Sequence, residues 1–244
     1  MKVLIYTDNV SNNHLLYYAL GRVLGKDSVF FVNSVELLQG ALTADVDLFV
    51  MPGGASRYKS AKLDGEGSQI IKHYVENGGR YLGICAGAYM GCEQTHWAPG
   101  EQHEIVTANE LAFFPGRAVG PVSQFGRGDN YNATQARVVK LNYQGKCVDS
   151  LYMGGCTFVP ESHEGYEVVA TFTDVPEQPA AIVRGEFGNG RWLLCSTHPE
   201  FDNEAISMLD FDVVGNQYSE FSAIRPQANL SLSLFEELLQ QLIY

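Results

Sequence analysis

The sequence places an apolar run directly before a Gly-x-Cys-x-Gly motif, in the segment Tyr81-Leu82-Gly83-Ile84-Cys85-Ala86-Gly87. A buried strand, this motif and a following helix together form a nucleophile elbow. The central residue of an elbow lies in a strained turn, and small residues two positions before and after it let strand and helix approach each other. We therefore expect Cys85 to lie at the end of a strand in an α/β sheet, with its sulfur exposed to a site.

Cysteine suits this position chemically. The unpaired amides at the start of a helix favour the thiolate form over the thiol, and the thiolate is the nucleophile. The competing interpretation is that Cys85 is a small buried hydrophobe beside a tight turn, as free cysteines often are.

A base for this thiol is predicted far down the chain, in Thr197-His198-Pro199-Glu200. The segment follows an apolar run, so it also lies at a strand end, where α/β sheets place their sites. In an extended segment, His198 and Glu200 project to the same side. Glu200 would orient His198, which would take the thiol proton and later protonate a leaving group. The alternative is a structural histidine in a turn.

An oxyanion formed at Cys85 would need fixed N–H donors. Pro52-Gly53-Gly54 follows another apolar run, and its glycines let the backbone turn its amides toward the cysteine. We expect the amides of Gly54 and Ala86 to be these donors, with Gly53 beside them in the pocket. A simple turn would explain the same three residues.

Apolar runs alternate with helical patterns in the first ninety residues. Apolar stripes at helical spacing occupy residues 15–24 and 70–75; Ser11 is the expected N-cap of the first, which Gly25 ends, and Gly78-Gly79 closes the second. This order predicts an α/β fold, a flavodoxin-like, doubly wound and mostly parallel sheet with helices on both faces. The runs expected to be strands buried on both faces are 3–6, 29–32, 48–51, 81–84 and 192–195.

The middle of the chain has a different composition. Residues 115–128 are rich in Gly and Pro, which predicts loops with short strands around them. Further strands, some antiparallel, are expected at 136–141, 148–153, 167–172 and 180–185. We interpret residues 1–244 as one domain, with a core of about 1–206 and a C-terminal helical extension at 207–244 whose apolar stripe packs on its own domain.

Composition limits the function classes. Among 244 residues, 28 acidic and 16 basic side chains give a net charge of −12, the wrong sign for binding nucleic acid or an anionic membrane. No apolar run approaches the roughly 18 residues that span a bilayer, and the N-terminus turns polar too early for a secretory signal. We therefore expect a cytoplasmic protein.

The five cysteines are an odd number without CxxC spacing, which predicts neither a disulfide framework nor a zinc ribbon. Cys92, His96 and His103 match no metal-ligand spacing, so no metal and no cofactor are expected. Cys156 follows Gly154-Gly155 and is either a pocket residue or part of the core. His14, His73 and His163 are expected at the surface.

Pro-Gly-Gly, Gly-x-Cys-x-Gly and His-Pro-Glu, in this order, resemble the class I glutamine amidotransferase fold over about residues 1–206. The segments 51–55, 74–89 and 110–116 more narrowly resemble the amidotransferase-like N-terminal domain of eukaryotic biotin-protein ligases. The resemblance implies a catalytic triad of Cys85, His198 and Glu200 and oxyanion donors at Gly54 and Ala86.

Two features depart from these families. Glutamine amidotransferases usually carry Gln four residues after the nucleophile, whereas this chain has Tyr89, a candidate pocket residue. Biotin ligation needs a separate catalytic domain with a Gly/Arg-rich adenylate loop, and the short Gly126-Arg127-Gly128-Asp129 does not supply one. A third family, of hydrolases and chaperones, has histidine directly after the elbow cysteine, where this chain has Ala86.

Two hypotheses follow for function. In the first, Cys85 attacks an amide or acyl carbonyl of a small molecule, and water or an amine resolves the thioester, giving hydrolysis or acyl transfer. In the second, the chain is a binding or regulatory module that keeps the shape without turnover. A protein partner or a homodimer is compatible with either hypothesis.

Overall fold

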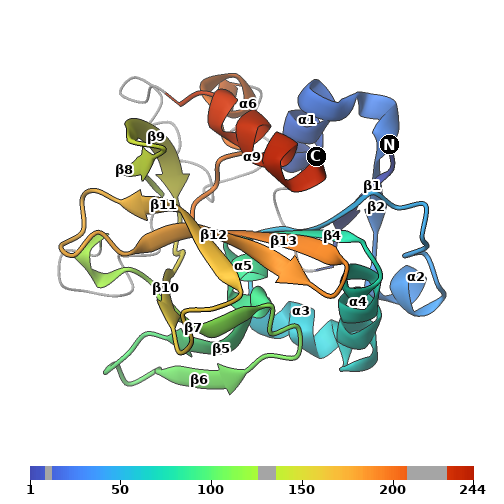
Figure 1. Cartoon of the computed structure of the whole chain (residues 1–244), viewed down its shortest axis with the longest axis horizontal. Coiled ribbons are helices and arrows are strands. Elements are labelled where there is room, and N and C mark those ends of the chain that lie inside the picture. The colour runs from blue at the N-terminus through green and yellow to red at the C-terminus, as the bar shows by residue number, and fades with distance from the viewer. Residues whose placement is uncertain (9–12, 126–135, 208–229) are drawn as a thin grey trace.

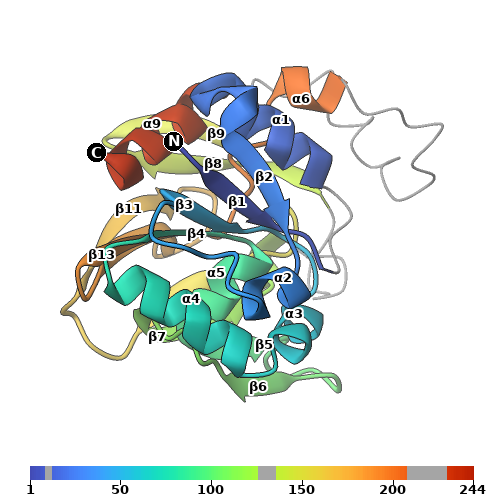
Figure 2. The ribbon, with the colours of Figure 1, turned by 90° about the vertical axis from the view of Figure 1, so that its right-hand side faces the viewer.

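The computed structural model describes residues 1–8, 13–125, 136–207 and 230–244. A central mixed sheet is covered by helices on both faces (Figures 1 and 2). Five neighbouring strands of this sheet are parallel, in the order β2-β1-β3-β4-β13, which is the flavodoxin order and confirms the predicted fold class. These strands are β1 (Val3–Tyr6), β2 (Val29–Val32), β3 (Leu48–Met51), β4 (Arg80–Ile84) and β13 (Gly190–Cys195).

Side chains of β1 alternate between two hydrophobic cores. Val3 and Ile5 pack on the face that α1 (Asn13–Leu24) and α9 (Ser233–Ile243) cover, whereas Leu4 and Tyr6 pack on the face of α4 (Glu66–Glu76) (Figure 2). The apolar stripe of α9 is buried in the first core, so its predicted packing on its own domain is confirmed. The other helical segments are α2 (Ser34–Leu38), α3 (Ser56–Leu63), α5 (Ala86–Gly91), α6 (Asn203–Ser207), η1 (Lys26–Ser28) and η2 (Ser123–Phe125).

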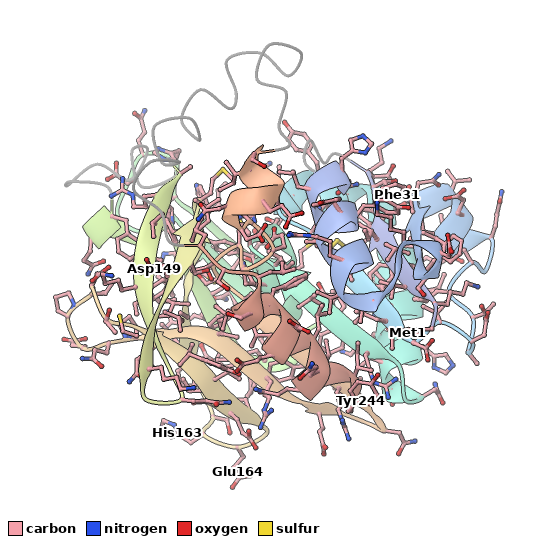
Figure 3. The ribbon with its side chains drawn as sticks, turned by 90° about the horizontal axis from the view of Figure 1, so that it is seen from above. Met1, Phe31, Asp149, His163, Glu164 and Tyr244 are labelled. Carbon is pink, nitrogen blue, oxygen red and sulfur yellow. The ribbon has the colours of Figure 1, made fainter. Side chains whose placement is uncertain are left out.

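The predicted helix ends agree with the structure where it describes them. Gly25 and Gly78 take positive φ values of 93° and 105° just after α1 and α4, a conformation that glycine adopts at little cost. Ser11 lies outside the described residues. One prediction for the strands was wrong: β2 is not buried on both faces, because it is the edge strand and leaves Phe30 and Phe31 48% and 42% exposed (Figure 3 labels Phe31).

The second half of the sheet is mainly antiparallel, and it contains more regular structure than the composition predicts. The four strands expected there are confirmed, but residues 115–120, expected to be a loop, belong to a strand between two others. A Cβ on Gly116 would lie 2.3 Å from Val159 O, so glycine is needed there for close strand approach. The strands are β5 (Cys92–Trp97), β6 (Ile105–Ala108), β7 (Phe114–Gly120), β8 (Arg137–Tyr143), β9 (Lys146–Tyr152), β10 (Thr157–Pro160), β11 (Tyr166–Phe172) and β12 (Ala180–Phe187).

The three histidines that were predicted to lie at the surface are found there. His14, His73 and His163 are exposed, and Figure 3 shows His163 at the edge of the molecule. Cys147 and Cys195 lie in β9 and β13. Within the described ranges, no helix has both the length and the apolar character needed to cross a bilayer.

Candidate active site

Cys85 lies in a strained turn between β4 and α5. Its backbone has φ 51° and ψ −103°, a region that residues with a Cβ rarely occupy. Two glycines make the turn possible: a Cβ on Gly83 would lie 2.5 Å from Gly87 O, and one on Gly87 would lie 2.0 Å from Met51 O. The strand, sharp turn and helix expected for an elbow are therefore present.

The sheet brings His198 to this turn. β4 and β13 are parallel neighbours with Ile84 opposite Cys195, and Cys85 N donates to Cys195 O at 2.8 Å. Three residues after β13, His198 N donates to Leu151 O at 2.7 Å, which fixes the backbone of the base. Strand ends separated by more than a hundred residues thus place a thiol and an imidazole in one site.

The loop at Gly53 packs closely against Cys85 and His198. A Cβ on Gly53 would lie 2.6 Å from His198 Cε1 and 3.5 Å from Cys85 Cβ. The loop after β3, the elbow and the segment after β13 therefore meet at one point. This point has no room for a residue larger than glycine at position 53.

His198 and Glu200 form a buried pair. Nδ1 of His198 lies 2.8 Å from Oε1 of Glu200, and each residue is 3% exposed. Within the described residues, His198 Nε2 and Glu200 Oε2 have no hydrogen-bond partner. Burial alone would lower the pKa of His198, but the Glu200 carboxylate and the Cys85 sulfur outweigh burial and raise this pKa to about 10. The imidazolium form is thus favoured at neutral pH.

Cys85 Sγ donates a hydrogen bond to Met153 O at 3.5 Å. The free Nε2 of His198 is the nitrogen that a base needs for the thiol proton, because Nδ1 is held by Glu200. Because the imidazolium form is favoured, the thiol proton can rest on this nitrogen and pass from it to a leaving group.

The expected oxyanion donors border the same space. Gly54 and Ala86 both line a cavity with Cys85 and His198. Within the part of the chain that the structure describes, neither amide donates a hydrogen bond, so both N–H groups are free for a ligand. Free amides beside a nucleophile are what a developing oxyanion requires.

The cavity has a volume of about 800 Å³ and is lined mainly by apolar side chains. Gly53 and Tyr89 line it, as expected for pocket residues. Tyr89 is 2% exposed, donates its hydroxyl to Gly154 O at 3.2 Å and packs against Trp97 at a ring distance of 5.6 Å. Cys156 does not line this cavity: it is fully buried in the core, where burial raises the pKa of its thiol.

Two other features near the site could not be predicted from local sequence patterns. Lys59 in α3 is fully buried and donates to Pro52 O at 2.9 Å. Arg22 in α1 binds both carboxylate oxygens of Asp202, two residues after Glu200, at 2.7 and 3.0 Å. The pair of Arg22 and Asp202 joins distant segments, and Lys59 is buried only by the packing around its helix, so no local pattern marks either feature. Among the described residues, no group of His, Cys, Asp and Glu forms a metal site, and His96 is paired with Glu104.

A family model described as "Biotin-protein ligase, N terminal" matches residues 1–243. The chain belongs to this family. The match confirms the narrower of the two resemblances predicted above; it leaves the class I amidotransferase superfamily as a resemblance.

Two relatives resemble this member of the family over most of its length. An uncharacterized protein of Chlamydia muridarum is 32% identical over 223 residues, which cover 87% of this chain and 85% of the relative. The biotin–protein ligase of Schizosaccharomyces pombe is 30% identical over 220 residues, which cover 86% of this chain. The match spans only 35% of that ligase.

Solved structures support the fold alone. A cytoplasmic protein of Salmonella typhimurium superposes with a TM-score of 0.52 and 15% identity, and the match covers 99% of both chains. The carbohydrate deacetylase Agd3 gives a TM-score of 0.52 at 10% identity, covering 84% of this chain and 30% of the deacetylase.

Proposed function

We propose that the protein is a cysteine-dependent enzyme that hydrolyses or transfers an amide or acyl group of a small molecule. The observation that carries this proposal is the buried His198–Glu200 pair with its free Nε2 beside a cysteine in a strained elbow. A structural histidine would have both nitrogens hydrogen-bonded in such a buried place.

The steps follow from the positions of these groups. The proton of Cys85 rests on His198 before the reaction, so the sulfur attacks the carbonyl carbon as a thiolate, and the amides of Gly54 and Ala86 stabilise the oxyanion. The imidazolium then protonates the leaving amine or alcohol as the carbon–heteroatom bond breaks. Water or an amine attacks the thioester, returns a proton to His198 and releases Cys85.

The cavity favours a substrate other than glutamine. Tyr89 stands where glutamine amidotransferases usually carry Gln, and its ring is fixed by Gly154 and Trp97. An apolar lining and a volume of about 800 Å³ suit an acyl group larger than a glutamine side chain. The net charge of −12 argues against nucleic acid or an anionic membrane as partner.

The test is a screen of amides and thioesters by intact mass, looking for an acyl adduct on Cys85. We expect the adduct to persist in His198→Ala, because resolution of the thioester needs the base. Cys85→Ala should lower any turnover at least ~100-fold, whereas Cys147→Ala, which removes an exposed cysteine, should leave it unchanged. Turnover that survives in Cys85→Ala would contradict the proposal.

A second candidate is a non-catalytic binding or regulatory module. It is favoured by the S. pombe relative, in which the matching region is 35% of a biotin–protein ligase and so is only a part of that protein. In this case Cys85 would form no acyl adduct with any member of the screen, and a small molecule bound in the cavity would still raise the melting temperature.

A further inference from the structure

Lys59 is a charged residue in an unusual environment. It belongs to α3, has no exposed surface, and its Nζ donates to the carbonyl of Pro52 at 2.9 Å. The same Nζ lies 5.8 Å from the centre of the Tyr6 ring. Throughout the described ranges, no carboxylate lies within ion-pair distance of Lys59. An ammonium group in this position is therefore buried without an ion-pair partner.

An unpaired buried charge lowers the stability of a fold, so stability does not explain why a lysine occupies position 59. Nζ of Lys59 lies over the Tyr6 ring, and the charges of Cys85 and Asp8 act on the amine. Asp8 accepts a hydrogen bond from Ser34 N at 2.7 Å and does not reach the amine. Burial lowers the pKa of Lys59 to about 7, while the negative charges of Cys85 and Asp8 act in the opposite direction.

The hydrogen bond of Lys59 acts on the loop that borders the nucleophile. The C=O of Pro52 and the N–H of Gly53 belong to one planar peptide and point in opposite directions, so fixing the carbonyl also fixes the amide. Gly53 is the residue whose added Cβ would lie 2.6 Å from His198 Cε1 and 3.5 Å from Cys85 Cβ. The peptide that Lys59 holds therefore lies directly beside the imidazole and the elbow.

We propose that Lys59 is a positioning residue of the nucleophile site: it fixes the Pro52-Gly53-Gly54 loop and supplies positive charge to an anion formed at Cys85. The inference rests on one part of the proposed function, the nucleophilic thiol of Cys85, and not on the amide or acyl substrate. A neutral residue of similar length could fill the space but would supply no charge.

Alkylation of Cys85 tests this role without a known substrate. The rate with iodoacetamide at pH 7 is followed by peptide mass in the full chain, and the exposed Cys147 serves as an internal reference. Lys59→Met and Lys59→Gln should each slow alkylation of Cys85 roughly tenfold, because the thiolate is the reacting form. Lys59→Arg keeps the charge and should restore most of the rate.

Lys62→Met is the matched control, since Lys62 lies on the same helix and is exposed. Its Cys85 should react within about twofold of the wild-type rate. Thermal unfolding adds a readout that separates positioning from support of the fold: Lys59→Met should melt no lower than wild type, because removing a lone buried charge relieves its desolvation.

The outcomes separate this inference from the proposed function. If a folded Lys59→Met or Lys59→Gln variant alkylates like Lys62→Met, the role of Lys59 is overturned, even if Cys85 forms acyl adducts. If alkylation depends on Lys59 but no amide or thioester acylates Cys85, the proposed enzyme fails and the role of Lys59 stands. A wild-type Cys85 that iodoacetamide does not modify would overturn the inference about Lys59.

Discussion

Glu200 determines the charge of the candidate base. Its carboxylate is buried against His198 Nδ1 and, with the Cys85 sulfur, raises the pKa of the imidazole to about 10 against the effect of burial. In the folded protein His198 therefore holds its proton at pH values where an unfolded histidine has lost it.

The first prediction concerns Glu200→Gln. The amide can still accept from Nδ1 but carries no charge, so the pKa of His198 should fall well below about 10. A raised pKa stabilises the fold fully below about pH 6.5 and progressively less as pH rises toward 10. The difference in unfolding free energy between wild type and variant should therefore be larger at pH 6.5 than at pH 10.

Urea unfolding at several pH values measures this difference, and a nitrogen-detected NMR titration of the imidazole reports the pKa directly. Glu186→Gln, an exposed carboxylate on β12, is the control and should leave both quantities unchanged. An imidazole that titrates at the same pH in Glu200→Gln as in wild type would contradict the role assigned to Glu200.

Single residues also show how far sequence reasoning reaches. Cys85, His198 and Glu200 could be predicted to meet because each motif carries its own local signal: a turn flanked by glycines, and a stiff His-Pro-Glu at a strand end. Lys59 could not be predicted, because a lysine on a short helix is usually solvated and only the packing around it makes it buried.

At the scale of elements, α9 completes the core on one face of the sheet. Phe235 and Leu238 are buried against the same cluster as Leu16 and Leu20 of α1. The two helices come from opposite ends of the chain and lie side by side over β1 (Figures 1 and 2).

The second prediction is that Phe235→Ala destabilises the protein by about 3 to 5 kcal/mol, the usual cost of removing a buried aromatic ring. Glu236→Ala, on the exposed side of the same helix, should change stability by no more than about 0.5 kcal/mol. Urea denaturation followed by far-UV circular dichroism distinguishes the two. Equal midpoints for both variants would show that α9 contributes little to the fold.

The elements that sequence reasoning missed share a cause. No strand was predicted at β5 or β6, and β7 lies in a stretch where glycine and proline predict loops, yet β7 pairs with both β5 and β10. A Cβ on Gly120 would lie 2.0 Å from the Tyr89 hydroxyl, so this glycine reflects close packing, not a turn. Composition reports local preference, whereas these strands depend on partners elsewhere in the chain.

In the molecule as a whole, the pair of Arg22 and Asp202 joins the first helix to the segment that carries the site. The two terminal guanidinium nitrogens of Arg22 donate to the Asp202 carboxylate. Asp202 Oδ1 also accepts from Ala205 N at the start of α6. The side chains of Arg22 and Asp202 are 16% and 9% exposed.

The third prediction is that Arg22→Met lowers the unfolding free energy by about 1 to 3 kcal/mol, because it leaves a largely buried carboxylate without its ion-pair partner. Lys26→Met, which replaces an exposed lysine nearby, should have little effect. Thermal and urea unfolding measure both. If Arg22→Met and Lys26→Met unfold at the same midpoint, this ion pair does not hold the two regions together.

The left-handed conformation of Cys85 has a consequence for how such a protein could change over time. Glycine would adopt this turn more easily than any residue with a side chain, so selection for folding alone would replace the cysteine. A cysteine in this turn therefore costs stability that a glycine would not, and if the proposed thiol chemistry were lost, a lineage would gain stability by replacing the cysteine with glycine.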